Sequence, residues 1–472
     1  MSLTTPTPSS ARAATTSTRG ATMNADVIVV GGGIAGLAAA VRCADLGLTP
    51  LVLEASDRVG GRMTTDRIGG FVIDRGVTLP TRSFRRMRAL ARRFGLGPLM
   101  RDIDFTLGIR DDDGGTRAYR ARHFEDILLD THLSPAARFA FVRTGLDLAR
   151  FDGLLAHGDG DKSARLDTED TLTYVRRFGP GGEEMLRRVF GPGIRGAIGM
   201  ELSSCSRAVL FTVARNTMRP GFWNLTGGVD QIPEAMARSL DVLRGAKARH
   251  VRVSGSGVEV DVAMEGGSRT LRARAAILAT PGQLAAAICP SLPEWLGAPL
   301  RRTEYSRIVC AYVAWSTRPA RPCTGYAFER TAPSDPASVE LEHLRAPAAC
   351  PSGAALFSVY FCDTPDFRCL MMSDDEIAAR AIAAVRRTCD PRDGHELFVH
   401  VVRWEHGLAR FGAGRFKEVA EVRRRLASWD QPLDCCGDYL DGIASEGALR
   451  TGEQAAQRLA RRLAHTAGPR HR

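Results

Sequence analysis

The hydrophobic positions near the start of the chain predict a strand, a tight turn and a helix in direct succession. Residues 27–30 are a β-branched run, three glycines follow, and residues 37–41 are alanine and other apolar residues. Gly47 would end that helix, and residues 51–54 form a second short apolar strand. Short apolar runs bounded by glycine are typical of buried strands, so the segment predicts one βαβ unit of a parallel sheet.

An amphipathic helix is predicted over residues 81–94. Phe84, Met87, Ala91 and Phe94 recur there at helical spacing. The intervening positions hold six arginines, which are Arg82, Arg85, Arg86, Arg88, Arg92 and Arg93. Such a basic face is consistent with exposure to solvent, with contact to a membrane surface or with binding of an acidic substrate.

The rest of the chain mixes helical and strand patterns. Residues 133–215 are mostly helical in pattern, and alternating apolar positions follow them. Strands are expected at 251–253, 258–262, 275–279, 306–315 and 355–362, and helices at 374–388 and 452–465. This mixture of elements predicts an α/β fold.

The turn after the first strand has the glycine spacing of a dinucleotide site. Gly31, Gly33 and Gly36 form a GxGxxG motif between a strand and a helix, and Glu54 ends the next strand about 20 residues on. Gly31 permits the tight turn, Gly33 lets the backbone approach a pyrophosphate, and Gly36 permits close packing of the helix. The helix N-terminus supplies amide donors, and Glu54 can accept hydrogen bonds from ribose hydroxyls.

Two further motifs distinguish between the possible dinucleotides. Residues 57–62 (DRVGGR) follow Glu54, and residues 70–76 (GFVIDRG) come shortly after. Together these motifs resemble those of the flavin amine oxidase and protoporphyrinogen oxidase superfamily, which also contains the phytoene-type desaturases. The resemblance implies that the segment from Glu54 to Arg62 wraps around FAD, with its glycines and final arginine along the phosphates and the flavin.

Later segments extend the resemblance in the same order along the chain. Residues 223–233 are similar to the family's return to the flavin domain, and residues 250–253 to its adenine-contacting strand. Residues 437–439, followed by 446–448, are similar to its C-terminal flavin segment, in which an aspartate lies near the ribityl and pyrophosphate groups. The residues thereby implied in FAD binding are Gly31, Gly33, Ile34, Ala35, Gly36, Glu54, Ala55, Arg58, Gly60, Gly61, Arg62, Val251, Gly437 and Asp438.

The resemblance also implies a domain organisation, a Rossmann-like FAD-binding domain interleaved with an α+β substrate domain. The first would comprise residues 24–82, 220–285 and 400–468, and the second residues 83–219 and 286–399. A ligand pocket between two domains is a common arrangement.

The first 23 residues have a different composition from the rest. They are rich in Ser, Thr and Ala, with two arginines and no acidic residue. This composition predicts a disordered tail. Organelle transit peptides share it, and Met23 is an alternative start of the protein.

Overall composition narrows the class of protein. The 472 residues are 44% hydrophobic and 25% charged, as in a folded soluble protein of two or more domains. The net charge of +11 comes from arginines dispersed along the chain, with lysine only at Lys162, Lys247 and Lys417. Nucleic-acid-binding proteins normally concentrate their basic residues, so no nucleic-acid partner is expected. The eleven cysteines form no CxxC pair, which favours a reduced, cytoplasmic compartment and no metal site.

The substrate side departs from the amine-specific members of the resembling family. These carry a lysine near the flavin, whereas residues 303–308 contain none, and an aromatic residue just before the EGA motif, where Ala444 and its neighbours stand here. The cysteine that attaches flavin covalently in some members is absent from residues 409–414. The resemblance therefore implies non-covalent FAD and a substrate other than a simple amine. Candidates for the substrate pocket are Tyr305, Arg307, Trp404, Phe411 and Ala444, and candidates for binding substrate carboxylates are Arg85, Arg92, Arg307 and Arg410.

The expected activity is that of an FAD-dependent oxidase or dehydrogenase. It would remove hydride from a C–N or C–C bond of a sizeable, partly apolar small molecule, with reoxidation by oxygen or a quinone. A porphyrinogen or a secondary metabolite is favoured as substrate. Two alternatives stay open, a carotenoid or lipid desaturase or isomerase at a membrane surface, and an amine oxidase. No catalytic residue is singled out. Membrane contact would be peripheral, because the longest apolar run, residues 27–41, is shorter than a span of ~20 residues.

Overall fold

A computed structural model gives the arrangement of most of the chain. It describes residues 25–110, 114–155, 160–218, 221–255, 257–329, 335–362, 367–389 and 394–466. The predicted disordered tail, residues 1–23, lies outside these residues.

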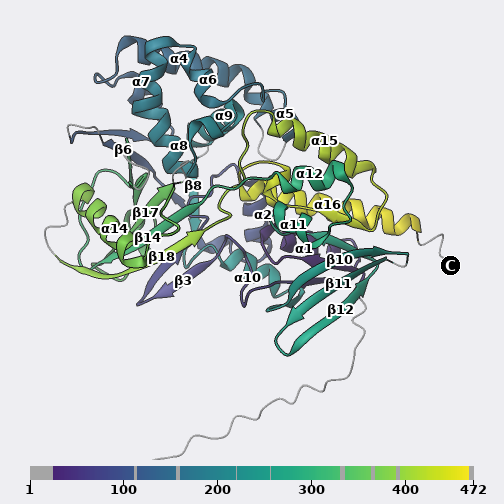
Figure 1. The fold of residues 1–472 in the computed structure, drawn as a ribbon. Coiled ribbons are helices and arrows are strands. Elements are labelled where there is room, and N and C mark those ends of the chain that lie inside the picture. Colours follow the sequence, from purple (N-terminus) through teal and green to yellow (C-terminus); the bar gives the residue numbers. More distant parts are fainter. Residues whose placement is uncertain are drawn as a thin grey trace, which may run out of the picture.

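A parallel five-stranded sheet carries the first part of the fold (Figure 1). Its strands, in spatial order, are β19 (Leu433–Cys435), β13 (Ala275–Leu278), β1 (Val27–Val30), β2 (Pro50–Leu53) and β9 (Asp241–Leu243). The predicted βαβ unit is confirmed as β1, α1 (Ile34–Asp45) and β2, with β1 and β2 parallel. Residues 27–30 and 50–53 are all buried, as expected for strands covered on both faces.

Different layers cover the two faces of this sheet. On one face, α1 packs against α16 (Ser445–Thr466) and α10 (Gln231–Ala237). On the other lies an antiparallel three-stranded sheet of β10 (Lys247–Ser254), β11 (Gly257–Met264) and β12 (Gly267–Ala273). Gly452 lets α16 cross α1 closely, because a Cβ there would overlap the carbonyl oxygen of Ala35.

A mixed seven-stranded sheet forms the second part. Its order is β18 (Glu396–Trp404), β14 (Ile308–Trp315), β17 (Ala355–Cys362), β16 (Ser338–Leu341), β15 (Gly325–Phe328), β6 (Thr106–Arg110) and β7 (Thr116–Arg120). Helix α14 (Asp374–Cys389) packs on one face. The hairpin of β3 (Thr65–Ile68) and β4 (Phe71–Asp74) packs on the other, through Phe71 and Ile73.

The helical region expected over residues 133–215 is present at one end of the molecule (Figure 1). It contains α4 (Pro135–Phe151), α6 (Thr171–Arg176), α7 (Gly179–Met185), α8 (Gly191–Ile198) and α9 (Arg207–Met218). The remaining α-helices and β-strands are α2 (Arg85–Arg93), α3 (Glu125–Leu128), α5 (Gly160–Ser163), α11 (Gly282–Ile288), α12 (Glu294–Arg301), α13 (Glu342–Arg345), α15 (Arg415–Ser428), β5 (Met100–Ile103) and β8 (Phe222–Leu225). No helix in the described part of the chain is long and apolar enough to cross a membrane.

The predicted α/β class is confirmed, while some element bounds differ. The helix expected at 452–465 begins at Ser445, and the amphipathic helix spans Arg85–Arg93. The proposed domain boundary at residue 400 falls inside β18, which pairs with β14 of the seven-stranded sheet. Likewise α2, grouped by sequence with the substrate domain, packs on α16 beside the five-stranded sheet. The division into two domains remains a proposal.

Candidate functional site

The turn between β1 and α1 contains two glycines, Gly31 and Gly36, that no other residue could replace without moving the backbone. Gly31 has a φ of +113°, and a Cβ there would lie 2.9 Å from the carbonyl oxygen of Ala279 on the neighbouring strand. A Cβ on Gly36 would overlap the carbonyl oxygen of Gly31. These two positions fix the shape of the turn and the approach of α1 to the sheet.

Gly33 faces open space instead. It is the residue that caps α1, with a φ of −70° that any L residue can adopt. A Cβ added there would meet no atom within 4 Å, and the nearest atom to a Cβ on Gly61 would be the Cα of Gly33, at 3.4 Å. The first turn of α1, beginning at Ile34 and Ala35, contains no acidic residue, and no side chain caps it among the described residues. Uncapped amides beside an open space fit a pyrophosphate.

Glu54 lies directly against this turn. Its Oε2 accepts a hydrogen bond from the Gly32 N–H at 2.8 Å, and its Oε1 accepts from the Ser56 N–H at 2.9 Å and the Ser56 hydroxyl at 2.8 Å. Because a carboxylate has about four acceptor positions, the fixed group can also accept from a ribose hydroxyl. Ala55, between the two, follows the same bend of the chain.

The segment that follows β9 meets Glu54. The Ala246 N–H donates to the Glu54 carbonyl oxygen at 2.8 Å, and the Gly245 N–H donates to the Ser56 carbonyl oxygen at 2.9 Å. Val251 lies five residues further along β10, fully buried in the core. The structure therefore brings residues 245–246 beside Glu54, and the role of Val251 in FAD binding stays a prediction.

Residues of the DRVGGR segment (57–62) make contacts in two different parts of the site. Gly60 donates its N–H to the carbonyl oxygen of Gly32 at 2.8 Å, so it joins the glycine turn. Arg58 instead forms an ion pair with Asp66 of β3, at 2.7 Å between Nη1 and Oδ1. Asp66 also contacts His400 of β18, with 2.8 Å between Nε2 and Oδ2.

Arg62 and Asp438 meet although 376 residues separate them in the chain. The Arg62 Nη1 lies 2.7 Å from the Asp438 Oδ2 and also donates to the Gly407 carbonyl oxygen. Burial lowers the pKa of the Arg62 guanidinium, but the neighbouring Asp438 carboxylate more than offsets this and holds it above the usual value. Gly437, just before Asp438, donates its N–H to the Thr451 hydroxyl of α16 at 3.0 Å.

Two distant segments run side by side next to Arg62. The Ser306 N–H donates to the Leu408 carbonyl oxygen, and the Arg410 N–H donates to the Glu304 carbonyl oxygen, both at 2.8 Å. Tyr305 lies between them, with its ring centre 5.9 Å from the Arg62 guanidinium carbon. Its hydroxyl accepts from the Gly282 N–H at 2.9 Å, and burial raises its pKa.

Trp404, in the second of these two segments, lies against Arg75. Residues 303–308, residues 404–410 and Arg75 together form the wall beside Arg62. The indole N–H of Trp404 donates to the Arg75 carbonyl oxygen at 2.9 Å, and the Arg75 guanidinium lies 5.4 Å from the Trp404 ring centre. The next residue, Gly76, is packed so tightly on Arg62 that a Cβ would overlap the Arg62 carbonyl oxygen. Arg307 lies over the ring of Phe367 at 5.7 Å, and Arg410 is 3.6 Å from the Glu304 carboxylate.

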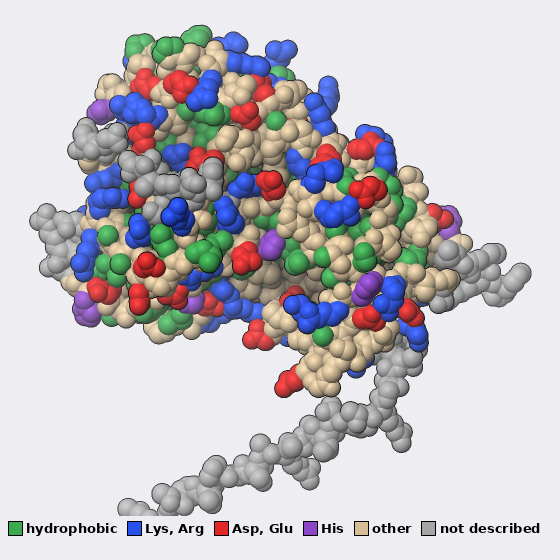
Figure 2. All heavy atoms as spheres, viewed as in Figure 1, with side chains coloured by type: hydrophobic (Ala, Val, Ile, Leu, Met, Phe, Trp, Pro, Cys, Tyr) green, Lys and Arg blue, Asp and Glu red, His purple; other side chains and the backbone are tan. Residues whose placement is uncertain are grey.

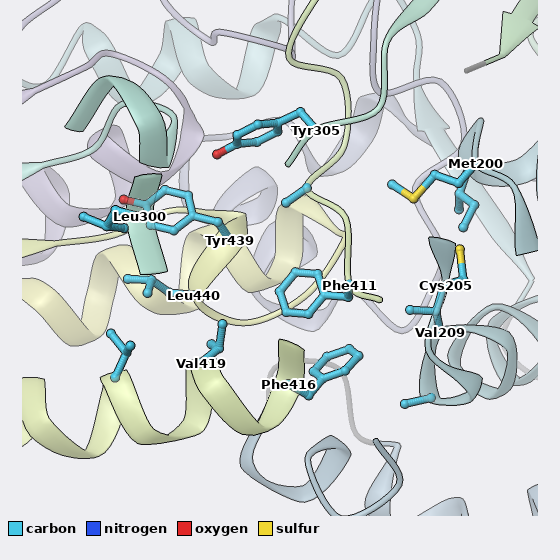
Figure 3. Packing of buried hydrophobic residues seen from close by; sticks show 14 of the residues in the cluster. Met200, Cys205, Val209, Leu300, Tyr305, Phe411, Phe416, Val419, Tyr439 and Leu440 are labelled. Carbon is cyan, nitrogen blue, oxygen red and sulfur yellow. The ribbon is translucent and has the colours of Figure 1, made fainter. Parts of the chain in front are cut away.

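Other predicted residues are placed elsewhere. Figure 3 shows Phe411 packed toward Phe416 below Tyr305, and the two phenyl centres are 4.5 Å apart. Phe411 is therefore part of a core cluster. Ala444 is half-buried beside the other cluster, just before α16 begins. Arg85 and Arg92 are exposed on α2 and are not brought to the Arg62 wall.

The basic helix α2 is held to the rest of the protein by acidic side chains of α1 and α16. Arg86 contacts Glu453 at 3.0 Å, and Arg93 contacts Asp45 at 2.6 Å. The buried Glu446 carboxylate accepts the N–H groups of Arg86 and Met87 at the start of the helix, at 2.8 and 3.1 Å. Burial raises the pKa of Glu446. Glu446 belongs to the segment 446–448 that resembles the family's C-terminal flavin segment, but only the fold shows that it caps α2.

Asp74 is a second acid that sequence reasoning passed over. It ends β4 within the GFVIDRG motif and accepts hydrogen bonds from the Thr65 hydroxyl at 2.7 Å and the Val229 N–H at 2.9 Å. Burial raises its pKa from 3.8 to about 6. The sequence does contain a signal for Asp74, because it is an acidic residue at the end of an apolar strand, directly before Arg75.

Comparisons with known proteins agree with a flavin site. The family described as flavin containing amine oxidoreductase matches residues 34–460. Coproporphyrinogen III oxidase of Bacillus subtilis is 22% identical, over 91% of this chain and 96% of its own length. Coproporphyrinogen III oxidase of Mycobacterium tuberculosis is 27% identical, over 88% and 93%. The solved structure of cyclohexylamine oxidase from Brevibacterium oxydans has the same fold, with a TM-score of 0.71 and 19% identity over 93% of this chain and 100% of that one.

Proposed function

Because this chain belongs to the flavin-containing amine oxidoreductase family and is an FAD-dependent oxidoreductase, we propose that it oxidises a porphyrinogen that bears several carboxylates. The substrate is a sizeable, partly apolar molecule, and the bonds oxidised are the C–C and C–N bonds around its saturated bridges. Oxygen or a quinone takes up the electrons afterwards.

The observation that carries the proposal is the wall beside Arg62. Residues 303–308 and 404–410 run side by side, and they carry two arginines, Arg307 and Arg410, and two aromatic side chains, Tyr305 and Trp404. An arginine has five N–H donors in a planar fork, which matches the two oxygens of a carboxylate. Aromatic rings complement the flat pyrrole units of a tetrapyrrole.

Amine-specific members of the family carry a lysine near the flavin, so the positions of the lysines in this chain argue against a simple amine as substrate. Lys162, Lys247 and Lys417 are all exposed, and none lies in the two segments that form the wall. The curated relatives named above are coproporphyrinogen oxidases matched over nearly their whole length, which supports a porphyrinogen in preference to an amine.

FAD, when bound, supplies the hydride acceptor. The amides at the start of α1, beside the open space at Gly33 and Gly61, would hold the pyrophosphate, and Glu54 would hold a ribose. The Arg62–Asp438 pair fixes the backbone around Gly407 and keeps the two wall segments in register. Arg307 and Arg410 orient the substrate through its carboxylates. Each oxidation step also releases a proton.

The test compares a tetracarboxylate substrate with its ester. Coproporphyrinogen III and its tetramethyl ester are supplied to the holoenzyme, and porphyrin fluorescence is followed. Losing one charged hydrogen bond costs about 1.5–3 kcal/mol, so Arg307→Gln and Arg410→Gln should each raise KM for the acid at least tenfold and leave the ester unchanged. Arg269→Gln, on the exposed β12 strand, is the matched control. Equal losses for acid and ester would refute carboxylate binding by these residues, and no porphyrin from either substrate would refute the porphyrinogen proposal.

A further inference from the structure

Two residues on one face of the seven-stranded sheet are more exposed than their neighbours. Strands β14 and β17 lie between other strands of the sheet, and their residues are buried except Ile308 and Tyr360, which are half-buried. Both residues point to the face that the β3–β4 hairpin covers, because Tyr360 pairs with Cys310 and Cys310 lies two residues from Ile308. With strands on either side, the exposure of Tyr360 indicates an opening in the layer that covers this face.

Two elements cover the face and leave Tyr360 between them. The β3–β4 hairpin packs over Leu356, toward the start of β17. Helix α8 lies over the other end of the strand, where a Cβ on Gly199, the residue that ends this helix, would lie 3.5 Å from the Cys362 Sγ. Leu356, Tyr360 and Cys362 lie on the same side of β17, so Tyr360 faces the gap between the hairpin and the helix.

The opening adjoins the wall beside Arg62. Trp404 pairs with Ile308 across β18 and β14, so their side chains are neighbours on this face. Thr78 lies on another side of the opening, where its Oγ1 accepts a hydrogen bond from the Tyr360 hydroxyl at 3.4 Å, and Thr78 is itself half-buried. A sizeable molecule that binds against Trp404 would therefore reach Tyr360 and Thr78.

The residues that line this opening, Ile308, Tyr360, Thr78 and Trp404, carry no charge. The outer surface differs, because Figure 2 shows basic and acidic side chains close together over the visible face. The Tyr360 hydroxyl stays protonated, since burial raises its pKa well above the ordinary value. A side chain that keeps some exposure, yet has its pKa raised by burial, lies at the bottom of a depression and not on the outer surface.

A cation near Tyr360, Arg345, is already occupied. Its guanidinium donates to Glu340 at 2.9 Å and also to Glu342, and its side chain is only 1% exposed. Arg345 is therefore not available to a ligand in the opening. Hydroxyl groups alone would leave the charge of a carboxylate largely uncompensated, which is costly away from water. The opening thus suits a neutral hydrogen-bonding group better than a carboxylate.

We propose that the Tyr360 hydroxyl accepts a hydrogen bond from a pyrrole N–H of the porphyrinogen, and that Thr78 positions this hydroxyl. The inference rests on the proposed function, because the pyrrole N–H groups belong to that substrate class. The proton of Tyr360 is directed to Thr78, which leaves the lone pairs of the phenolic oxygen for a donor. A hydrogen bond to one pyrrole unit fixes how the macrocycle is turned in the opening, which contacts to carboxylates at its rim leave free.

The experiment measures kcat/KM of the full-length holoenzyme for coproporphyrinogen III and for its tetramethyl ester, which share the same N–H groups. Tyr360→Phe keeps the ring and removes the hydroxyl, so it should lower kcat/KM about fivefold for both substrates alike. Thr78→Val should lower it about threefold. Adding Thr78→Val to Tyr360→Phe should cost little more, because Thr78 acts through the Tyr360 hydroxyl.

Tyr326→Phe is the matched control. Tyr326 is a buried tyrosine of β15 in the cluster on the opposite face of the sheet, so its substitution should leave kcat/KM unchanged for both substrates. The melting temperature and an FAD titration verify that each variant folds and binds the cofactor as the wild type does. If Tyr360→Phe does not fold, Thr78→Val alone decides, by an equal loss for both substrates or by none.

The outcomes separate this inference from the proposed function. An active wild type with an equally active Tyr360→Phe variant would overturn the inference and leave the proposed function standing. A loss confined to the tetracarboxylate would also overturn it, because Tyr360 would then act on a carboxylate. So would a double variant whose loss is the product of the two single losses, since Thr78 would then act independently. No porphyrin from the wild type with either substrate would overturn both.

Discussion

Replacing Gly33 by aspartate separates cofactor binding from folding more cleanly than any other change in the glycine turn. The residue has a φ of −70° and caps α1, and a Cβ there meets no atom within 4 Å. Aspartate is a better N-cap than glycine by a few tenths of a kcal/mol. The apoprotein should therefore be as stable as the wild-type apoprotein, or slightly more stable.

The same carboxylate would project into the space that suits the pyrophosphate. Two unit charges ~4 Å apart repel by about 4 kcal/mol at an effective dielectric constant of about 20. This corresponds to roughly a thousandfold weaker binding of FAD. Gly33→Ala adds only the methyl group, so its loss of affinity should be smaller.

Both quantities can be measured on one preparation. FAD is removed, the melting temperature of the apoprotein is recorded by circular dichroism, and FAD is then titrated back while flavin fluorescence is followed. Gly36→Ala serves as the opposite control, because its Cβ would overlap the Gly31 carbonyl oxygen and should lower stability before any cofactor is added. A Gly33→Asp protein that binds FAD as tightly as the wild type would falsify the placement of the pyrophosphate.

Three further changes test other contacts. Gly452→Leu should cost about 3 kcal/mol in the free energy of unfolding, since α16 must move away from Ala35, and a wild-type denaturant midpoint would contradict this. Arg62→Met should cost about 2 kcal/mol by leaving the buried Asp438 unpaired, less than a fully buried pair because the Arg62 side chain is 31% exposed; adding Asp438→Asn should recover most of the loss. Asp74 has its pKa raised by burial to about 6, so between about pH 4 and pH 6 the unfolded chain ionises first and the contribution of Asp74 to stability falls as pH rises. Asp74→Asn should lack that fall, and parallel curves of melting temperature against pH for the two proteins would argue against it.

Local spacing was sufficient to predict the glycine turn. Gly36 lies against Gly31, and Glu54 accepts from Gly32, so both contacts are made within one βαβ unit. The strands at 308–315 and 355–362 and the helix at 374–389 were likewise predictable, because each is long and strongly patterned.

Pairings between distant segments lie outside what the sequence pattern reveals. That Ala246 meets Glu54 is decided by where β9 ends beside β2, which no single-strand pattern shows. Phe411 belongs to the core because α15 presents Phe416 to it. The short strands β6, β7 and β15 were not predicted, since four or five residues carry too little periodicity.

The wall beside Arg62 likewise forms only when distant segments of the chain pair in the folded protein. Tyr305 and Trp404 are about a hundred residues apart in the chain, and β14 and β18 bring their segments together. From sequence alone they were only candidates for a pocket.

The most direct test of the proposed function is a single anaerobic mixing experiment. The FAD-loaded protein is mixed with coproporphyrinogen III in the absence of oxygen, and the long-wavelength absorption of the oxidised flavin is followed. The account predicts that this absorption bleaches, faster with more substrate, and returns when oxygen or a quinone is added. A flavin that stays fully oxidised in excess coproporphyrinogen, yet bleaches with a chemical reductant, would contradict it.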